Sequence, residues 1–358
     1  GAKLSCKGQF GSRAMSLQQT ITKLIFKLPG GLLVRMAGGK PLEINGRVLE
    51  PQLQMVAWNG RNAPPLSSLP ADVVQAATRE QLAMMAAAPE PGVIIEDSTI
   101  PGPDKNEIPV RIYLPDEQDT SNPMMVYYHM GGGVIGDLDT CNAFCSMIAT
   151  IAKCPVLSVD YRLAPPHKFP AGIDDAMAAY EWALRNASKY GAPAGVAAVG
   201  GDSMGGNFAA IVSQEMKRQD KPIPALQLLI YPAVDLVEEF PSRTAFGETF
   251  SLSTDTMNWF MDQYLPEGHD RSDPLLSPGQ SGDLSGLPPA IVITAGHDPL
   301  VDEGDDYALR LRRDGVYVKH KRYDNLSHAF TAFTDFSPGS RRACLQIAGM
   351  VRDMYGRL

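Results

Sequence analysis

From Val93 to the end of the chain, short runs of β-branched and other apolar residues alternate with longer stretches of helical periodicity. The apolar runs predict strands at Val93–Asp97, Ile108–Leu114, Met124–His129, Val156–Asp160, Val196–Gly200, Leu226–Tyr231, Ala290–Ala295 and Val316–Tyr323. The periodic stretches predict helices at Asn142–Lys153, Ile173–Tyr190, Gly205–Arg218, Gly304–Arg313 and Arg341–Tyr355. Strands that alternate with helices form right-handed crossovers and a mostly parallel sheet. Since the first three strands have no helix between them, we expect that edge of the sheet to be antiparallel.

The segment before Val93 has a different pattern. Apolar residues recur at helical spacing from Leu17 to Leu28, and Lys23 and Lys27 fall on the other side of that helix. Pro29 and the two glycines after it are expected to end the helix. Such a helix can lie on a membrane or cover an apolar site, but we favour packing on its own domain or on a partner subunit. A second helix, rich in Ala and Met, is predicted at Ala71–Ala88.

A long stretch between Val234 and Pro288 interrupts the alternation of strands and helices. It contains one clear helix, near Thr256–Tyr264, and many turn residues. Insertions of this length are usually lids or binding elements. We therefore predict a catalytic domain formed by residues 91–234 and 287–358, with a cap formed by an N-terminal segment, residues 1–90, and an insertion, residues 235–286.

Composition excludes several classes of protein. The chain has 358 residues and a net charge of −8, which argues against a general nucleic-acid-binding protein. No apolar stretch is long enough for a membrane span, and the N-terminal region lacks the pattern of a secretory signal. The five cysteines are irregularly spaced, so neither a disulfide framework nor a zinc site is predicted, although Cys141 and Cys145 could share a helix face. No metal is expected.

The sequence Gly201-Asp202-Ser203-Met204-Gly205 matches the pattern G-x-S-x-G, and it lies directly between a predicted strand and a predicted helix. A sharp turn in this position exposes the central serine and aims the helix N-terminus at charge that forms beside it. Glycine is required on either side because a Cβ atom would collide with neighbouring backbone. We therefore predict that Ser203 is a nucleophile, the alternative being an ordinary serine in a glycine-rich turn.

A serine nucleophile needs a base and a group that orients the base. Of the six histidines, His328 follows the last predicted strand, and so lies at the edge of the sheet where the nucleophile is expected. Asp298 follows the preceding strand, which gives the chain order Ser203, Asp298, His328. Asp302 is the alternative acid, and Asp298 is favoured because it is nearer the strand end.

Acyl transfer also needs hydrogen-bond donors for an oxyanion. The segment His129-Met130-Gly131-Gly132-Gly133 follows a predicted strand, where such a donor loop is expected. The backbone N–H groups of Gly131, Gly132 and Met204 are the candidate donors. The alternative, a phosphate-binding loop, lacks support because no Lys-Ser/Thr pair follows the glycines.

Together these motifs resemble one family. They are His129–Gly133, Asp160–Pro165 with His167, Phe169 and Pro170, Gly201–Gly206, Asp298–Leu300 with Asp302–Gly304, and His328–Phe330. The chain resembles the hormone-sensitive-lipase-like esterases of the α/β-hydrolase superfamily, also called bacterial family IV, in the subgroup with Asp before the nucleophile. The resemblance implies a mostly parallel eight-stranded sheet flanked by helices, a helical cap, and a cofactor-free cytoplasmic carboxylesterase that prefers short- to medium-chain esters and forms a homodimer.

The chain departs from the family pattern at two positions of the glycine loop. The family has His-Gly-Gly-Gly followed by an aromatic residue, whereas this chain has Met130 at the first glycine and Gly133 at the aromatic position. Loss of the aromatic side chain is expected to enlarge or loosen one wall of the substrate pocket, to which we assign Met130, Gly133 and Asp202. Asp202 is too close to Ser203 in the chain to orient a remote histidine, and a structural role at the turn is its alternative.

The predicted function is therefore that of a serine carboxylesterase. Two alternatives stay open. One is a non-catalytic ligand receptor on the same fold, which is disfavoured because His328 is present with the other catalytic candidates. The other is an enzyme with a different substrate bond, such as an amidase, lactonase or thioesterase, or a lipase for long chains that uses the helix at Leu17–Leu28. The first 46 residues are not matched to the family.

Overall fold

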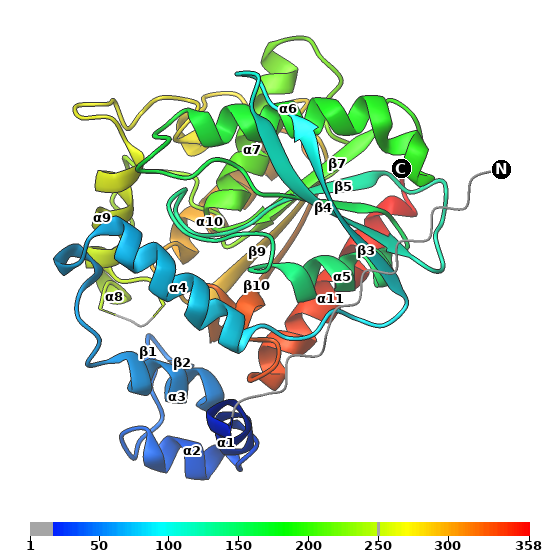
Figure 1. Ribbon diagram of the computed structural model, residues 1–358. Helices are drawn as coiled ribbons and strands as arrows, with labels where there is room; N and C mark the ends of the chain where they lie inside the picture. Colours follow the sequence, from blue (N-terminus) through cyan, green and yellow to red (C-terminus); the bar gives the residue numbers. More distant parts are fainter. Residues whose placement is uncertain (1–16, 249–250) are drawn as a thin grey trace.

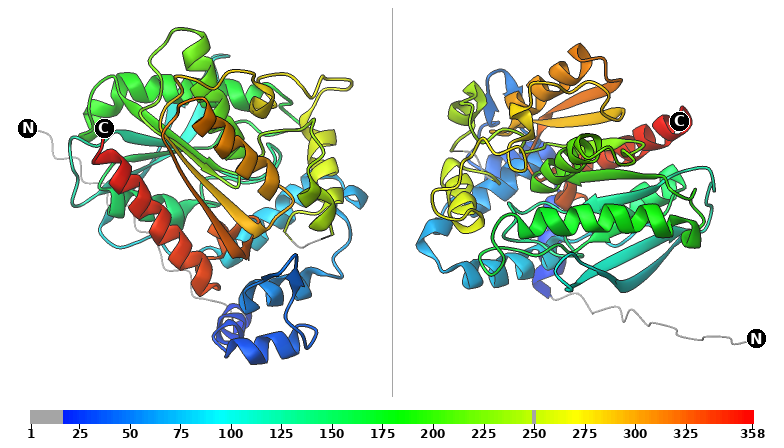
Figure 2. Two further views of the ribbon diagram at one scale, coloured as in Figure 1. Left: turned by 180° about the vertical axis from the view of Figure 1, so that it is seen from behind. Right: turned by 90° about the horizontal axis from the view of Figure 1, so that it is seen from above.

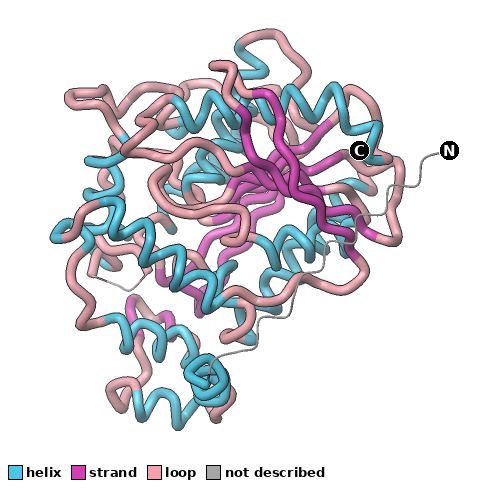
Figure 3. The backbone as a smooth tube through the Cα atoms, in the orientation of Figure 1, coloured by secondary structure: helices cyan, strands magenta, loops and turns pink. Residues whose placement is uncertain are grey.

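An eight-stranded sheet forms the centre of the protein (Figures 1 and 3). The computed structural model describes residues 17–248 and 251–358, with side chains from residue 22 onward, so Cys6 and the side chains of Leu17 and Ile21 lie outside the description. The strands are β3 (Val93–Pro101), β4 (Glu107–Pro115), β5 (Met124–Tyr128), β6 (Val156–Val159), β7 (Ala197–Asp202), β8 (Gln227–Ile230), β9 (Ala290–His297) and β10 (Val318–Ser327).

The strand order is β10-β9-β8-β7-β5-β6-β4-β3. β4 is antiparallel to both of its neighbours, whereas the strands from β6 to β10 pair in parallel. The predicted eight-stranded, mostly parallel sheet with an antiparallel edge is therefore confirmed. One local difference is that β10 continues past the predicted strand end at Tyr323 to Ser327, after a shift in its register with β9.

Helices cover both faces of the sheet (Figure 1). One face packs against α6 (Ala171–Asn186), α7 (Met204–Arg218) and α10 (Val301–Arg313), and the other against α5 (Asn142–Ala152) and α11 (Pro338–Tyr355). Along β5, Val126 and Tyr128 belong to the first core, whereas Met125 and Tyr127 belong to the second. Successive side chains of this fully buried strand therefore point to opposite faces of the sheet. Such a pattern is required when helices cover both faces.

The predicted helices are present with shifted ends. α10 begins at Val301 rather than Gly304, and α11 begins at Pro338 rather than Arg341. Short 3-10 turns lie at Leu66–Ser68, Ala187–Tyr190, Pro278–Gln280 and Phe330–Phe333. The insertion contains α9 (Thr254–Tyr264), as predicted, and also a short helix α8 (Pro241–Ala245). The side chains of Cys141, Cys145, Cys154 and Cys344 are buried free thiols.

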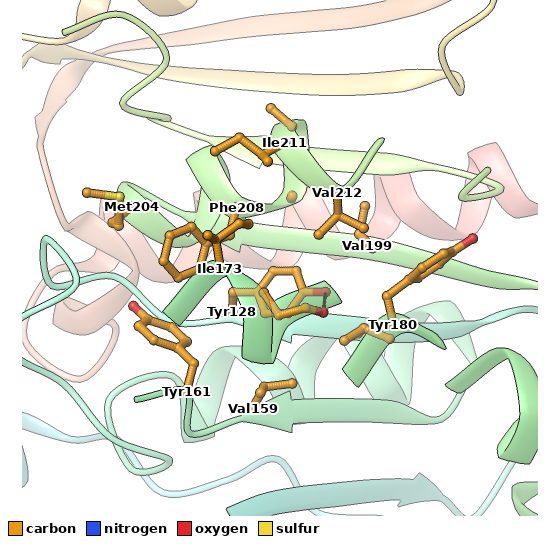
Figure 4. Packing of buried hydrophobic residues seen from close by; sticks show 14 of the residues in the cluster. Tyr128, Val159, Tyr161, Ile173, Tyr180, Val199, Met204, Phe208, Ile211 and Val212 are labelled. Atoms are coloured by element: carbon orange, nitrogen blue, oxygen red, sulfur yellow. Dashed lines mark hydrogen bonds between the residues drawn. The ribbon is translucent and has the colours of Figure 1, made fainter. Parts of the chain in front are cut away.

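The core beneath α7 fixes where that helix starts. The ring of Phe208 lies between those of Tyr128 and Tyr161, with centroid distances of 6.4 and 4.8 Å (Figure 4). At Gly205 an added Cβ atom would lie only 1.9 Å from the carbonyl oxygen of Tyr128. The first turn of α7 thus contacts β5 backbone to backbone, which only glycine allows.

The N-terminal lobe, defined here as residues 17–61, projects from the body (Figures 1 and 2). It contains α1 (Leu17–Phe26), α2 (Gly30–Met36), β1 (Glu43–Ile44), β2 (Arg47–Val48) and α3 (Pro51–Gly60), and α4 (Ala71–Met85) follows it. A small separate core joins the lobe to the loop before α11, and it consists of Phe26, Leu33, Ala37, Met55 and Phe336. The favoured packing of the first helix on its own domain is therefore confirmed. α1 ends at Phe26, before Pro29, as predicted, and Gly30 and Gly31 begin a separate helix, α2.

Glu50 links the N-terminal lobe to the start of α11. Its buried carboxylate accepts hydrogen bonds from the Ser337 hydroxyl and from the Gly339 N–H, the latter at 2.7 Å. Ser337 is the N-cap of α11, and its hydroxyl oxygen also accepts from the Ser340 N–H at 2.9 Å. A negative charge at this helix end is favourable because the first N–H groups have no acceptor within the helix.

Replacing Glu50 by Ala should lower the free energy of unfolding by about 1–3 kcal/mol, because two buried donors lose their acceptor. Urea unfolding measures this change, and limited proteolysis should show faster cleavage in the N-terminal lobe. Glu43→Ala, at an exposed carboxylate in the same lobe, is the matched control and should change stability little. Equal stabilities of the two variants would contradict the role given to Glu50.

Candidate active site

Ser203 occupies the turn between β7 and α7. Its φ and ψ are 56° and −118°, a conformation that residues with a Cβ atom rarely adopt. The turn is held from both sides, because the Ser203 N–H donates to the Ile230 carbonyl at 2.9 Å and the Asn207 N–H donates to the Ser203 carbonyl at 3.0 Å. The predicted strand–turn–helix context of Ser203 is therefore present.

Two further side chains continue from Ser203 in one chain of hydrogen bonds. Nε2 of His328 lies 2.9 Å from Oγ of Ser203, and Nδ1 of His328 lies 2.8 Å from Oδ2 of Asp298. His328 directly follows β10, and Asp298 directly follows β9. All three residues stand at the carboxyl ends of parallel strands, which meet at one edge of the sheet. The three side chains are buried.

Asp298, and not Asp302, contacts the histidine. The second carboxylate oxygen of Asp298 accepts the Leu300 N–H at 2.9 Å, which orients the carboxylate toward His328. Asp302 accepts the Ser242 N–H at 2.8 Å and so holds the start of α8. The ring of Tyr231 packs against that of His328 with a centroid distance of 4.8 Å. The imidazole is thus held on one edge by a carboxylate and on one face by a tyrosine.

Other histidines contact groups that are not Ser203 or Asp298. Nδ1 of the buried His129 lies 2.7 Å from the Met130 carbonyl oxygen, and its ring stacks on Tyr161. Burial lowers the pKa of His129, and it lowers the pKa of His297 to about 4. His269 and His320 contact carboxylates away from Ser203.

The glycine loop lies beside the turn that carries Ser203. Gly131, Gly132 and Gly133 have φ values of 126°, 63° and 73°, a run that L side chains would not tolerate. An added Cβ atom at Gly205 would lie 2.8 Å from the His129 carbonyl oxygen, so the loop starts against the first turn of α7. Met204 opens α7, and its N–H therefore belongs to the turn that has no intrahelical acceptor.

The two departures from the family pattern have different outcomes. Met130 has a φ outside the left-handed region and lines the cavity next to Ser203. Gly133 is not among the lining residues, because the ring of Tyr264 from α9 lies 2.6 Å from where its Cβ atom would be. Phe260, one turn earlier, stands 2.4 Å from an added Cβ atom at Gly132. Aromatic rings from α9 therefore cover this part of the glycine loop, and the enlarged or loosened wall stays a prediction.

Asp202 also lies outside the cavity, which contradicts its assignment to the pocket. Its side chain is buried beneath the turn, where Oδ2 accepts hydrogen bonds from the Tyr231 hydroxyl at 2.9 Å and the Thr331 hydroxyl at 2.8 Å. Burial raises the pKa of Asp202, and the two hydroxyl donors oppose that rise. The structural role, considered as the alternative, is the one that these contacts support.

A cavity of about 1250 Å³ opens onto Ser203 and His328. Met130, Gly131 and Gly132 line its floor. The N-terminal lobe and α4 supply one wall, for example through Trp58 and Leu82, and the insertion supplies another through residues such as Phe260. Within residues 17–248 and 251–358, no group of three or more His, Cys, Asp and Glu side chains is placed to hold a metal ion.

An ion pair holds the insertion to the first turn of α10. The Arg243 guanidinium, which lines the cavity, donates to the buried Glu303 carboxylate at 2.7 Å, and Glu303 also accepts the Val234 N–H at 2.8 Å. Burial raises the pKa of Glu303 to about 7, and Arg243 opposes that rise. The sequence analysis did not predict this contact between the insertion and α10.

Sequence reasoning missed several residues around the site. Phe260 and Tyr264 fill the space over the glycine loop, and Tyr231 and Thr331 support Asp202 and His328. Tyr231 directly follows β8 and Thr331 lies three residues after His328, so the sequence already placed both residues near predicted elements of the site. For Phe260 and Tyr264 the sequence gives only an apolar periodicity, which does not reveal what the helix packs against.

Comparisons with known proteins identify the fold family and the activity of its relatives. A family model described as alpha/beta hydrolase fold matches residues 125–332. The carboxylic ester hydrolase LipN of Mycobacterium tuberculosis is 38% identical over 331 residues, which cover 90% of this chain and 88% of LipN. The ethyl acetate hydrolase of Pseudomonas putida is 35% identical over 74% of this chain and 85% of its own length.

Solved structures give the same result in three dimensions. An esterase of Pyrobaculum calidifontis superposes with a TM-score of 0.78 at 38% identity, covering 86% of this chain and 99% of the esterase. The chain therefore belongs to the alpha/beta hydrolase fold family, and its relatives within that family are carboxylic ester hydrolases.

Proposed function

We propose that Ser203 is the nucleophile of this carboxylesterase, that His328 is its general base and acid, and that Asp298 orients the imidazole. The observation that carries the proposal is the unbroken contact from Oγ of Ser203 through His328 to Asp298, at 2.9 and 2.8 Å. A carboxylate beside Nδ1 keeps that nitrogen protonated, so Nε2 is free to accept the serine proton.

The reaction then proceeds in two acyl transfers. Oγ of Ser203 attacks the ester carbonyl while His328 takes its proton, and the backbone N–H groups of Gly131, Gly132 and Met204 stabilise the oxyanion. The C–O bond to the alcohol breaks as the imidazolium returns the proton to the leaving oxygen. Water, deprotonated by His328, then attacks the acyl-enzyme and releases the carboxylic acid with free Ser203.

For the substrate we propose short- to medium-chain esters, within the hormone-sensitive-lipase-like branch and its subgroup with Asp before the nucleophile. Phe260 stands against Gly132 and so restricts the space next to the reacting carbonyl. One relative is named an ethyl acetate hydrolase, which fits a small acyl group. The family resemblance also leads us to propose a homodimer that works in the cytoplasm.

We further propose that residues 1–90 and 235–286 act together as a cap over a catalytic domain formed by residues 91–234 and 287–358. Both cap segments contribute side chains to the cavity, among them Trp58, Leu82 and Phe260. The ion pair between Arg243 and Glu303 ties the insertion to α10. A cap of this kind shields the reacting groups from bulk solvent and limits which esters reach Ser203.

Replacing Ser203 by Ala should lower kcat/KM for p-nitrophenyl butyrate by about 10⁴-fold or more, because the attacking oxygen is lost. Circular dichroism and thermal unfolding should match the wild type, since the Ser203 side chain is not part of either core. Turnover near the wild-type value in a folded Ser203→Ala variant would disprove the mechanism.

Asp298→Asn should lower kcat by roughly 10³- to 10⁴-fold, because an amide at this position favours the wrong histidine tautomer. Asp302→Asn is the matched control: it lies four residues away, contacts Ser242 rather than His328, and should keep kcat within about tenfold. Steady-state kinetics on p-nitrophenyl esters compare the two variants. If the Asp302 variant were the more severely impaired, the assignment of Asp298 would be wrong.

Phe260→Ala should shift the acyl-chain preference toward longer chains, because the ring that covers Gly132 is removed. The measurement is kcat/KM for a series of p-nitrophenyl esters from acetate to palmitate, in which the wild type should prefer the shorter members. We expect the octanoate-to-acetate ratio to rise by roughly tenfold. Tyr264→Phe, which keeps the neighbouring ring and removes only its hydroxyl, should leave the ratio unchanged. A Phe260 variant with the wild-type ratio would exclude Phe260 as a specificity determinant.

A further inference from the structure

Charge is distributed very unevenly along the chain. Residues 1–42 contain seven of the 32 Lys and Arg residues and none of the 40 Asp and Glu residues. The remaining 316 residues, with 25 basic and 40 acidic side chains, therefore have a net charge of −15. A basic segment attached to an acidic body is typical of proteins that contact a polyanion or an anionic membrane surface.

Most of the basic side chains described in this segment have no acidic neighbour. Lys23 pairs with Asp335 at 2.6 Å, which helps to seat α1 on the body. Lys27, Arg35 and Lys40 are exposed and make no ion pair within the part of the chain that the structure describes. These three charges are therefore available to an external partner.

Large apolar side chains are exposed among these charges. Leu24, Leu32, Met36 and Trp58 have exposed fractions of 59%, 43%, 42% and 37%. On α2, Leu32, Arg35 and Met36 are spaced three and four residues apart and so share one face of the helix. A helix face that mixes exposed Leu and Met with Arg matches the surface of helices that lie in a lipid headgroup layer.

This surface continues to the mouth of the cavity. Gly38, Lys40, Trp58 and Arg61 belong to the N-terminal lobe and also line the cavity that leads to Ser203. The Arg61 guanidinium lies over the Trp58 ring at 3.8 Å, which stacks a cation on an amphipathic ring in this part of the cavity lining. In Figures 1 and 2 the lobe projects from the body, so no other element of the described chain covers its outer side.

We propose that the N-terminal lobe docks on an anionic lipid surface and presents the cavity mouth to it. Basic side chains near such a surface attract it electrostatically, and the exposed Leu, Met and Trp side chains enter the headgroup layer. A second copy of the lobe fits less well, because two basic surfaces repel each other. None of the helices in residues 17–248 and 251–358 is long and apolar enough to cross a membrane.

Docking would bring ester substrates that partition into lipid close to the cavity mouth. This consequence rests on the proposed esterase function, whereas the docking itself does not. A binding measurement therefore tests the docking separately from the chemistry.

The test is co-sedimentation of the full chain with vesicles of phosphatidylcholine alone and of phosphatidylcholine mixed with phosphatidylglycerol. We expect binding to the mixed vesicles, little binding to phosphatidylcholine, and loss of binding in high salt, where surface charges are screened. Lys27→Glu/Arg35→Glu should weaken binding by at least about tenfold, since two attractive charges become repulsive. Leu32→Ser/Met36→Ser should also weaken it, because less apolar surface enters the headgroup layer.

The matched control is Lys105→Glu/Lys189→Glu, which makes the same charge change at exposed positions near α6. This control should bind as the wild type does, and all variants should hydrolyse the water-soluble p-nitrophenyl acetate at the wild-type rate. Failure of hydrolysis with intact binding would count against the proposed function alone. The docking would be disproved if the wild type did not bind the mixed vesicles, or if the Lys27→Glu/Arg35→Glu variant bound them as tightly as the wild type. The docking would also be disproved if the lobe substitutions converted a dimer of this chain into a monomer, because the surface would then be a subunit interface.

Discussion

The backbone contact between the first turn of α7 and the end of β5 is the constraint on which the rest of the site depends. It brings Gly205 so near Tyr128 that a Cβ atom would lie 1.9 Å from a carbonyl oxygen, and Ser203, two residues earlier, has a left-handed φ of 56°. Such a conformation costs about 1–3 kcal/mol and persists only where the surroundings impose it. Here the imposing contacts are the hydrogen bond from Ser203 to Ile230 and the packing of Phe208 between two tyrosine rings.

The same contact sets the position of the glycine loop, and the loop in turn determines where the insertion packs. Because Gly132 and Gly133 have no side chains, α9 can approach them closely, and Phe260 and Tyr264 fill the space. An insertion far away in the sequence thereby becomes a wall of the catalytic centre. A change in α9 is therefore expected to alter substrate preference without touching the hydrogen-bonded chain from Ser203 to Asp298.

The charged side chains near Ser203 differ in their surroundings from those on the N-terminal lobe. Around Ser203 the ionisable side chains are buried and held by specific partners, as with Asp202 beneath its two hydroxyl donors and Glu303 beside Arg243. On the N-terminal lobe they are exposed and largely of one sign. Buried compensated charges fix geometry, whereas exposed uncompensated charges act on partners and are sensitive to salt. The first arrangement serves the chemistry, and the second fits the proposed lipid surface.

The sequence by itself determined the elements and the residues that meet at the sheet edge, because these signals are local. Strand periodicity, a glycine motif between strand and helix, and the order Ser203, Asp298, His328 each occupy a few neighbouring positions. The structure brings these residues into hydrogen-bond contact. Only the tertiary structure decided which residues cover the glycine loop, that Asp202 lies beneath the turn rather than in the cavity, and that Asp302 holds Ser242. These outcomes depend on contacts between segments up to about 130 residues apart, and such contacts leave no periodic or motif signal in either segment.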